Sequence, residues 1–175
     1  MQEQTIVPLG PYGQQLFRAC RWAALFGGLV FVGLVLMSIV SIVGRKLLAM
    51  PVPGDVELLQ TCSAFAAASF FAYCHLAGGD VKVDFFTHHW KPSKVHVLDC
   101  LGSLLLATVG ALLCWRSLVG ALDIKDAGET TMILGWPLWI GQILMVPGFA
   151  LLALAGVYTA LGHGRLARNR GQQGV

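Results

Sequence analysis

Residues 55–90, DVELLQTCSAFAAASFFAYCHLAGGDVKVDFFTHHW, decide the fold that we expect for this chain. The run from Val56 to Leu76 is mostly apolar and carries a single acidic residue, Glu57. It has the length of about 20 residues that an α-helix needs to cross a bilayer. Charged and aromatic residues then mix in the segment after Gly79, as in a segment that lies flat on a membrane surface. The stretch therefore predicts a membrane crossing followed by an interfacial segment.

The composition of the whole chain indicates an integral membrane protein. Of its 175 residues, 56% are hydrophobic and only 12% are charged, whereas soluble domains carry about 25% charged residues. The net charge of +3 is too small to indicate nucleic-acid binding. The five cysteines form no C-x-x-C pair and lie in or beside apolar runs, so we interpret them as packing residues.

Four apolar runs have the length of transmembrane helices, and we place them at about residues 22–43, 56–76, 97–120 and 134–161. A proline-rich connection, Met50–Gly54, separates the first two. Trp136-Pro137-Leu138-Trp139 predicts the start of the fourth, with proline in the first turn and tryptophans at the level of the lipid headgroups. The expected fold class is an all-α integral membrane protein with one membrane domain.

Basic residues predict how the chain is oriented in the membrane. Eight of the 12 Lys and Arg residues fall on one side of the predicted spans: Arg18, Arg21, Lys82, Lys91, Lys94, Arg165, Arg168 and Arg170. Because basic loops stay in the cytoplasm, we expect both termini there and the acidic loop at residues 123–129 outside. Residues 165–175 are interpreted as a flexible tail.

Residues 80–91, between the second and third spans, predict a short amphipathic helix at the inner membrane surface. Phe85, Phe86 and Trp90 fall near one side of a helical wheel, and Asp80 is well placed as its N-cap. A soluble loop with scattered aromatic residues is the alternative, because so short a window gives a weak periodicity.

No reactive site is indicated by the residues. The histidines His75, His88, His89, His96 and His163 lie at the inner ends of spans, in the interfacial segment or beyond the fourth span. We interpret them as polar residues at a wet boundary rather than as ligands of haem or of a metal. No serine has a histidine at its depth, and no glycine-rich phosphate loop is present. We therefore predict no catalytic residue, no cofactor and no metal site.

Two ionisable residues stand near the outer ends of predicted spans. Glu57 opens the second span and Arg116 closes the third, where a charge is usually paired. Glu57 could pair with Arg116 at similar depth, or with Arg45 across the short first loop. We interpret such a pair as holding the subunit together, and a role in transport is the alternative.

Small residues and one proline predict how the helices pack. Small residues recur at every fourth position in the second and third spans: Ala64, Ala68 and Ala72, then Ser103, Ala107 and Ala111. Such stripes let helices approach closely, either within one chain or between chains. In the fourth span, Pro147 removes a backbone hydrogen bond and predicts a kink.

In the order of these features, the chain resembles the small membrane subunit of the tripartite ATP-independent periplasmic (TRAP) transporters. That family has four spans with both termini inside, a basic residue after the first and a glutamate at the start of the second. A Val-x-Val-Asp-like motif follows the second span, and an acidic-to-proline segment precedes the fourth. The corresponding positions here are Arg45, Glu57, Gly79–Asp84 and Glu129–Pro137. Asp80 departs from the family, which often has histidine there.

The resemblance implies a set of partners in the bacterial inner membrane. A large multi-span subunit would hold the substrate and sodium sites, and a periplasmic binding protein would deliver an organic acid. The small subunit would serve as a static scaffold within the lipid bilayer. Two other classes remain open from the residues alone: a haem-binding or enzymatic four-helix membrane subunit, and a small carrier that acts on its own.

Overall fold

The computed structural model describes residues 11–48, 52–79 and 92–172 and is built from helices. Its four helices are α1 (Pro11–Leu48), α2 (Asp55–Leu76), α3 (Pro92–Ala127) and α4 (Leu138–Gln172). Among the described residues, the only extended pairing is an isolated bridge between Thr130 and Pro137. The predicted all-α class is confirmed.

Two of the helices end at glycines that the sequence places there. After α2, Gly78 has a φ of 72° and donates its N–H to the carbonyl of His75 at 3.2 Å. After α3, Gly128 has a φ of 67° and donates to the carbonyl of Lys125 at 3.1 Å. Both arrangements are Schellman caps, in which a left-handed residue closes the helix and turns the chain away. At the other end of α3, Pro92 is the first helical residue, a position where proline loses no hydrogen bond.

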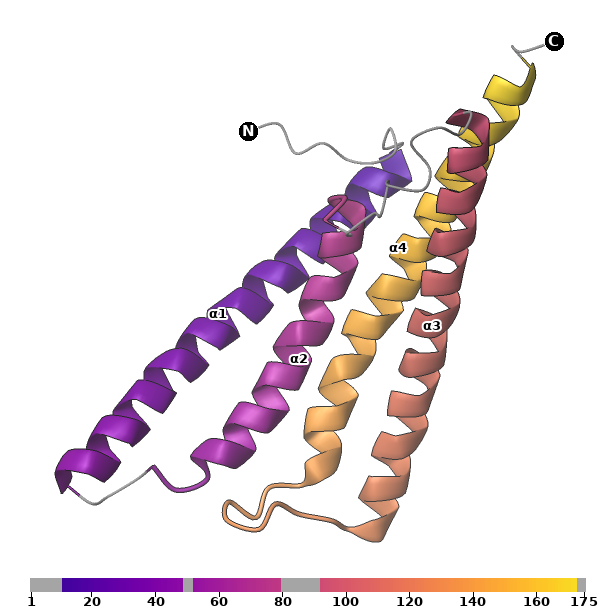
Figure 1. Ribbon diagram of the computed structural model, residues 1–175. Helices are drawn as coiled ribbons and strands as arrows, with labels where there is room; N and C mark the ends of the chain where they lie inside the picture. The colour runs from indigo at the N-terminus through magenta and orange to yellow at the C-terminus, as the bar shows by residue number, and fades with distance from the viewer. Residues whose placement is uncertain (1–10, 49–51, 80–91, 173–175) are drawn as a thin grey trace.

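The helices stand side by side in the order α1, α2, α4, α3 (Figure 1). Within the described ranges, α4 packs against both α2 and α3, whereas α2 and α3 do not contact each other. The α1–α2 and α3–α4 connections lie together at one end, which we call the hairpin end, and α1 begins at the opposite end (Figure 1). The chain therefore forms an open row rather than a closed bundle, with α1 and α3 at its two edges.

Two kinds of contact hold the row together. Between α1 and α2, aromatic rings pack in pairs at different depths: Phe26 and Phe65 meet edge to face with centroids 5.8 Å apart, and Phe31 and Phe70 stack with centroids 5.9 Å apart. Such aromatic pairs contribute about 0.5–1.5 kcal/mol each beyond their buried area. The contacts of α4 depend on glycine instead. A Cβ atom on Gly148 would lie 2.8 Å from the backbone of Ala68.

The small-residue stripes pack within this chain, against α4. Ala68 and Ala72 on α2 and Ser103 and Ala107 on α3 are buried, and a Cβ atom on Gly156 would lie 2.8 Å from Ala107. At these small residues, the backbones of α2 and α3 therefore lie close to the backbone of α4. Ala111, on the other hand, is exposed.

Among the described residues, three helices are long and apolar enough to cross a membrane: α1, α3 and α4. The fourth predicted span is α2, whose 22 residues would measure about 33 Å. This length fits the hydrocarbon core of about 30 Å. However, α2 is not among the helices with a window apolar enough to count as a candidate span, because polar residues such as Gln60, Thr61 and His75 interrupt its apolar run.

The structure also moves some boundaries. Helix α4 begins at Leu138 rather than at residue 134, and it continues to Gln172, whereas the sequence predicted a flexible tail from Arg165. Pro147 lies inside α4. The predicted interfacial helix, with Asp80, Asp84, Phe85, Phe86 and Trp90, lies outside the described residues.

Candidate functional site

The candidate site lies at the hairpin end, where the last turns of α1, the first turn of α2 and the segment before α4 meet. Two acidic residues stand in the first turn of α2, Asp55 and Glu57. Carboxylates are favoured there because the helix dipole and the free N–H groups present positive charge. Each of the two carboxylates binds a different neighbouring segment.

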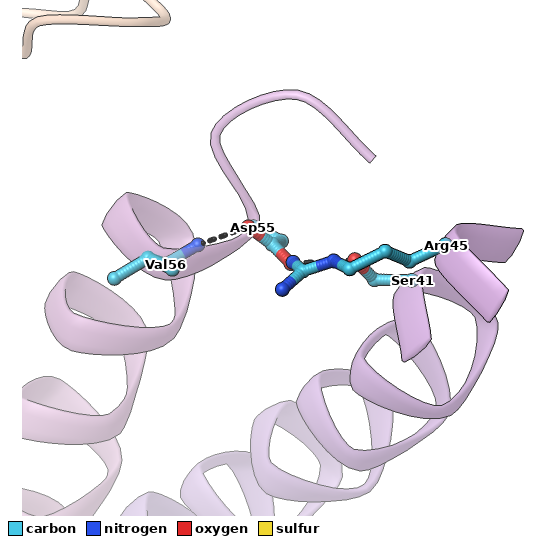
Figure 2. A network of polar contacts seen from close by, with 4 residues as sticks. All are labelled: Ser41, Arg45, Asp55 and Val56. Carbon is cyan, nitrogen blue, oxygen red and sulfur yellow. Dashed lines mark hydrogen bonds and ion pairs between the residues drawn. The ribbon is translucent and has the colours of Figure 1, made fainter. Parts of the chain in front are cut away.

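Asp55 ties α2 to α1 (Figure 2). Its Oδ2 accepts the hydroxyl hydrogen of Ser41 at 2.5 Å and lies 3.3 Å from the guanidinium of Arg45. Its Oδ1 accepts the backbone N–H of Val56 at 2.8 Å. The hydrogen bond from Ser41 is the main cause that lowers the pKa of Asp55, against a smaller desolvation effect, with further help from Val56 and Arg45. Asp55 therefore stays ionised and closes the α1–α2 hairpin.

Glu57 ties α2 to the segment before α4. Its Oε1 accepts the backbone N–H of Ile133 at 2.8 Å, and its Oε2 accepts the backbone N–H of Leu134 at 3.1 Å. One carboxylate thus binds two consecutive amides that are more than 70 residues away in the sequence. Hydrogen bonds to a charged acceptor are stronger than those between neutral groups.

The segment that Glu57 binds is folded on itself. The N–H of Thr131 donates to the carbonyl of Trp136 at 2.8 Å, and its hydroxyl oxygen accepts the N–H of Trp136 at 3.0 Å. The N–H of Leu138, the first residue of α4, donates to the carbonyl of Glu129 at 3.2 Å. These bonds close residues 129–138 into a loop. A displacement of Ile133 or Leu134 would therefore also move the first turn of α4.

Side-chain packing completes the joint between α2 and this loop. The side chain of Leu134 lies directly over Gly54, where a Cβ atom would come within 2.5 Å of it. Beside this contact is a pocket of about 120 Å³, whose lining includes Glu57, Thr61, Trp136 and Leu144. Its lining is mostly apolar, so the pocket suits an apolar side chain or the end of an acyl chain.

Glu57 contacts the backbone amides of the loop and pairs with neither of the two arginines considered as its alternative partners. Arg116 cannot reach it because α4 separates α2 from α3. Arg45 pairs with Asp55, which lies closer to the end of α1. The sequence did contain a signal for Asp55, since an acidic residue directly after a Pro-x-Pro-Gly turn is well placed at a helix N-terminus.

The other predicted residues spread over the same end of the row. Glu129 and Trp136 are exposed in the loop, and Pro137 directly precedes α4, where its carbonyl accepts the N–H of Ile140 at 3.3 Å. The ring of Trp139 lies 5.4 Å from the ammonium nitrogen of Lys125 on α3, a cation–π contact that joins α3 to α4. Pro147 is exposed.

Arg116 lies deeper along α3 than the sequence predicted. The predicted span ended near residue 120, but α3 continues to Ala127. The position of Arg116 relative to α4 follows from the contacts that nearby residues of α3 make with α4. The thiol of Cys114 lies 3.8 Å from the carbonyl of Val146, and Gly120 lies beside Gln142. Arg116 is therefore level with residues 142–146 of α4, inside the apolar part of the row, and its side chain is exposed.

Two histidines near the opposite end contradict the prediction of a wet boundary. His75 on α2 is buried, and its Nε2 lies 2.7 Å from the hydroxyl oxygen of Thr159 on α4. His163 is also buried and lies 3.9 Å from the carboxylate of Asp99 on α3. His75 is covered by α4 within the predicted fourth span, whereas His163 is enclosed because α4 continues past the predicted end of that span at residue 161. Among the described residues, no three His, Cys, Asp or Glu side chains are placed to hold a metal ion.

Comparison with known proteins gives the class of the chain. Residues 34–165 match the family described as "Tripartite ATP-independent periplasmic transporters, DctQ component". The match covers most of the chain, from the middle of α1 to the far part of α4, and it includes the whole candidate site. The chain therefore belongs to the DctQ family of TRAP transporter components, and the resemblance predicted from the sequence is confirmed. The searches of curated proteins and of solved structures gave no match.

Proposed function

We propose that this chain is the scaffold subunit of a TRAP secondary transporter and supports a large membrane subunit that carries the substrate. The main support for this proposal is Glu57, whose carboxylate joins the start of α2 to the loop before α4. Asp55 ties α1 to α2 in the same way. Both carboxylates fix helix ends relative to one another, as a static support requires.

The proposed position is the bacterial inner membrane, with α2 as a fourth span beside the three apolar helices. The basic residues in the first part of α1, Arg18 and Arg21, and those in the last part of α4 favour cytoplasmic termini. The hairpin end, with Asp55, Glu57 and the acidic loop 123–129, then faces the periplasm. The candidate site thus lies on the side from which a periplasmic binding protein would deliver the substrate.

The open row supports an accessory role. Many large apolar side chains remain exposed on the two edge helices, such as Leu29 (69%) on α1 and Leu105 (67%) on α3. In a membrane such faces meet lipid or another transmembrane subunit. A row with two free edges can add width to a larger subunit. We assign uptake of an organic acid, coupled to a cation gradient and most simply to Na⁺, to that large subunit.

The interfacial segment would act on the cytoplasmic side. Phe85, Phe86 and Trp90 carry the apolar face predicted from the sequence, and such a face buried among the headgroups resists displacement along the membrane normal. Replacing all three with serine should lower uptake or the yield of the complex. Unchanged uptake with an intact complex would exclude this part of the proposal.

Uptake measurements test the function directly. Cells that express the large subunit and the periplasmic protein are compared with and without this chain, using as labelled substrate an organic acid that the purified periplasmic protein binds. We expect uptake to fall at least about tenfold without the chain, and Glu57→Ala to give an intermediate loss. Uptake that does not depend on the chain would reject the scaffold role.

A further inference from the structure

Among the described residues, the outward face of α3 carries a charged side chain, Arg116, within its apolar part. Its residues recur at alternating steps of four and three, and all of them are exposed: Leu98, Gly102, Leu105, Val109, Leu112 and Arg116. This spacing is the heptad pattern with which one helix packs along another. The opposite side of α3, with Ala107 and Gly110, is already packed against α4.

The stripe has the shape of a helix-packing surface. Its four large residues are 45–67% exposed, and a Cβ atom on Gly102 would meet no atom within 4 Å. Gly102 therefore leaves a hollow between Leu98 and Leu105. A hollow flanked by large side chains suits a side chain from a neighbouring helix.

The level of Arg116 shows why lipid is a poor neighbour for this face. Lys125 and Trp139 are in contact, which places the tryptophan level of α4 beside Lys125. Arg116 is level with residues 142–146 of α4, which lie about 5–10 Å past Trp139 along that helix. Beside lipid, a guanidinium at that level would have to extend its side chain toward the headgroups to stay solvated. Charged residues in such positions are usually paired with an opposite charge.

The outward face of α1, in contrast, carries no charge in its apolar part. From Trp22 to Val43 it has no charged residue, and its exposed side chains, including Leu29 and Leu36, are apolar. Such a face can meet lipid at no electrostatic cost. The two edges of the row therefore suit different neighbours.

We propose that the α3 face from Leu98 to Arg116 is the surface on which the large membrane subunit docks, and that a carboxylate of that subunit pairs with Arg116. The inference rests on the proposed function, since it takes the large subunit as the partner. It specifies that the α3 edge of the row contacts the large subunit. It also specifies that the large subunit contributes a negative charge to this contact. The α1 edge then faces lipid.

Site-specific photocrosslinking tests the choice of edge. A benzophenone-bearing amino acid replaces Leu105 or Leu112 on α3, or Leu29 or Leu36 on α1 as matched controls, and the chain is co-expressed with the large subunit. We expect adducts with the mass of the large subunit from α3, at least about tenfold more abundant than from α1. Adducts mainly from α1, or adducts from α3 only with lipid or with a second copy of this chain, would overturn the inference.

Substitution of Arg116 tests whether its charge is needed to bind the large subunit. Arg116→Gln should lower recovery of the large subunit on affinity purification by about tenfold or more, because its carboxylate would lose its partner. Arg116→Lys, which keeps the charge but not the bidentate geometry, should lose less. Arg21→Gln, at an exposed arginine on α1, is the control and should change nothing. Unchanged recovery with Arg116→Gln would reject the pairing.

Two measurements distinguish a failure of the proposed docking face from a failure of the proposed function. The thermal stability of the purified Arg116→Gln chain should equal that of the unaltered chain, because Arg116 is exposed at the edge of the row. If the unaltered chain fails to recover the large subunit, the proposed function fails, and the docking face fails with it. If recovery succeeds but α3 gives no adduct, only the docking face is rejected.

Discussion

The carboxylate of Glu57 accepts the backbone N–H of Leu134 at 3.1 Å, while the side chain of Leu134 lies over Gly54 at the start of the same helix. Leu134 is therefore held from two sides by the first turn of α2. Since residues 129–138 form a closed loop, this contact sets where α4 begins relative to α2.

The first prediction concerns that contact. Glu57→Ala removes both acceptors, so the amides of Ile133 and Leu134 should open more often. We expect hydrogen exchange at these two amides to become faster by roughly tenfold or more. Exchange at Gly128, whose N–H bonds to Lys125 within the α3 cap, serves as the control and should not change. Equal protection of Ile133 in the variant and the unaltered chain would contradict the assigned role.

The second prediction concerns pH. The folded state lowers the pKa of Asp55, so its contribution to stability is fully present above the unfolded-state pKa of about 4 and is lost as the pH falls through the lower folded value. Ser41→Ala should raise the folded pKa of Asp55 and reduce the loss of stability on acidification. The measurement is thermal unfolding in detergent between neutral pH and pH 2.

Asp55→Asn is the control for this titration. The variant should be less stable at neutral pH, and Ser41→Ala should have no further effect on its pH profile. If Ser41→Ala changes the acid profile equally in the presence and absence of the Asp55 carboxylate, the hydrogen bond between the two residues is not the cause.

The third prediction concerns the close approach of α2 and α4. Gly148→Ala places a Cβ atom 2.8 Å from the backbone of Ala68, so the helices must move apart. The expected loss is about 1–3 kcal/mol of unfolding free energy, measured by thermal unfolding. Gly33→Ala on α1 meets no atom within 4 Å and should be neutral or slightly stabilising. Equal stability of the two variants would argue against this helix contact.

The fourth prediction concerns the buried pair of His75 and Thr159. Thr159→Val keeps the shape of the side chain but removes the hydroxyl that lies 2.7 Å from His75. We expect a loss of about 1 kcal/mol, the usual net value of a buried hydrogen bond. Thr108→Val is a matched control, because the exposed Thr108 hydroxyl bonds only to the carbonyl of Leu104 in its own helix. A loss as large for Thr108→Val would show that the pair has no special role.

The sequence predicted the helices and the segments of the site but not their contacts. Arg45, Glu57 and Glu129–Pro137 are recognisable one by one, since each lies where an apolar run starts or stops. That Glu57 meets Ile133 depends on α4 lying between α2 and α3. This order cannot be read from periodicity, because all faces of these helices are largely apolar.

The two buried histidines show a second reason for the differences. Hydropathy ends the second span near Leu76, which places His75 at a boundary. Its actual surroundings depend on Thr159 of α4, which lies within the predicted fourth span but whose packing against α2 is not visible in hydropathy. For His163, the continuation of α4 past residue 161 is hidden by small residues such as Gly162 and Gly164, because they carry little hydrophobic signal.

We propose that this chain works as one fixed part of a larger membrane assembly. Native mass spectrometry of the detergent-purified chain, co-expressed with the large TRAP membrane subunit from the same source, tests it most directly. The account predicts one dominant species that contains both subunits in a fixed ratio. A spectrum that shows only the free chain, or only copies of this chain bound to one another, would contradict it.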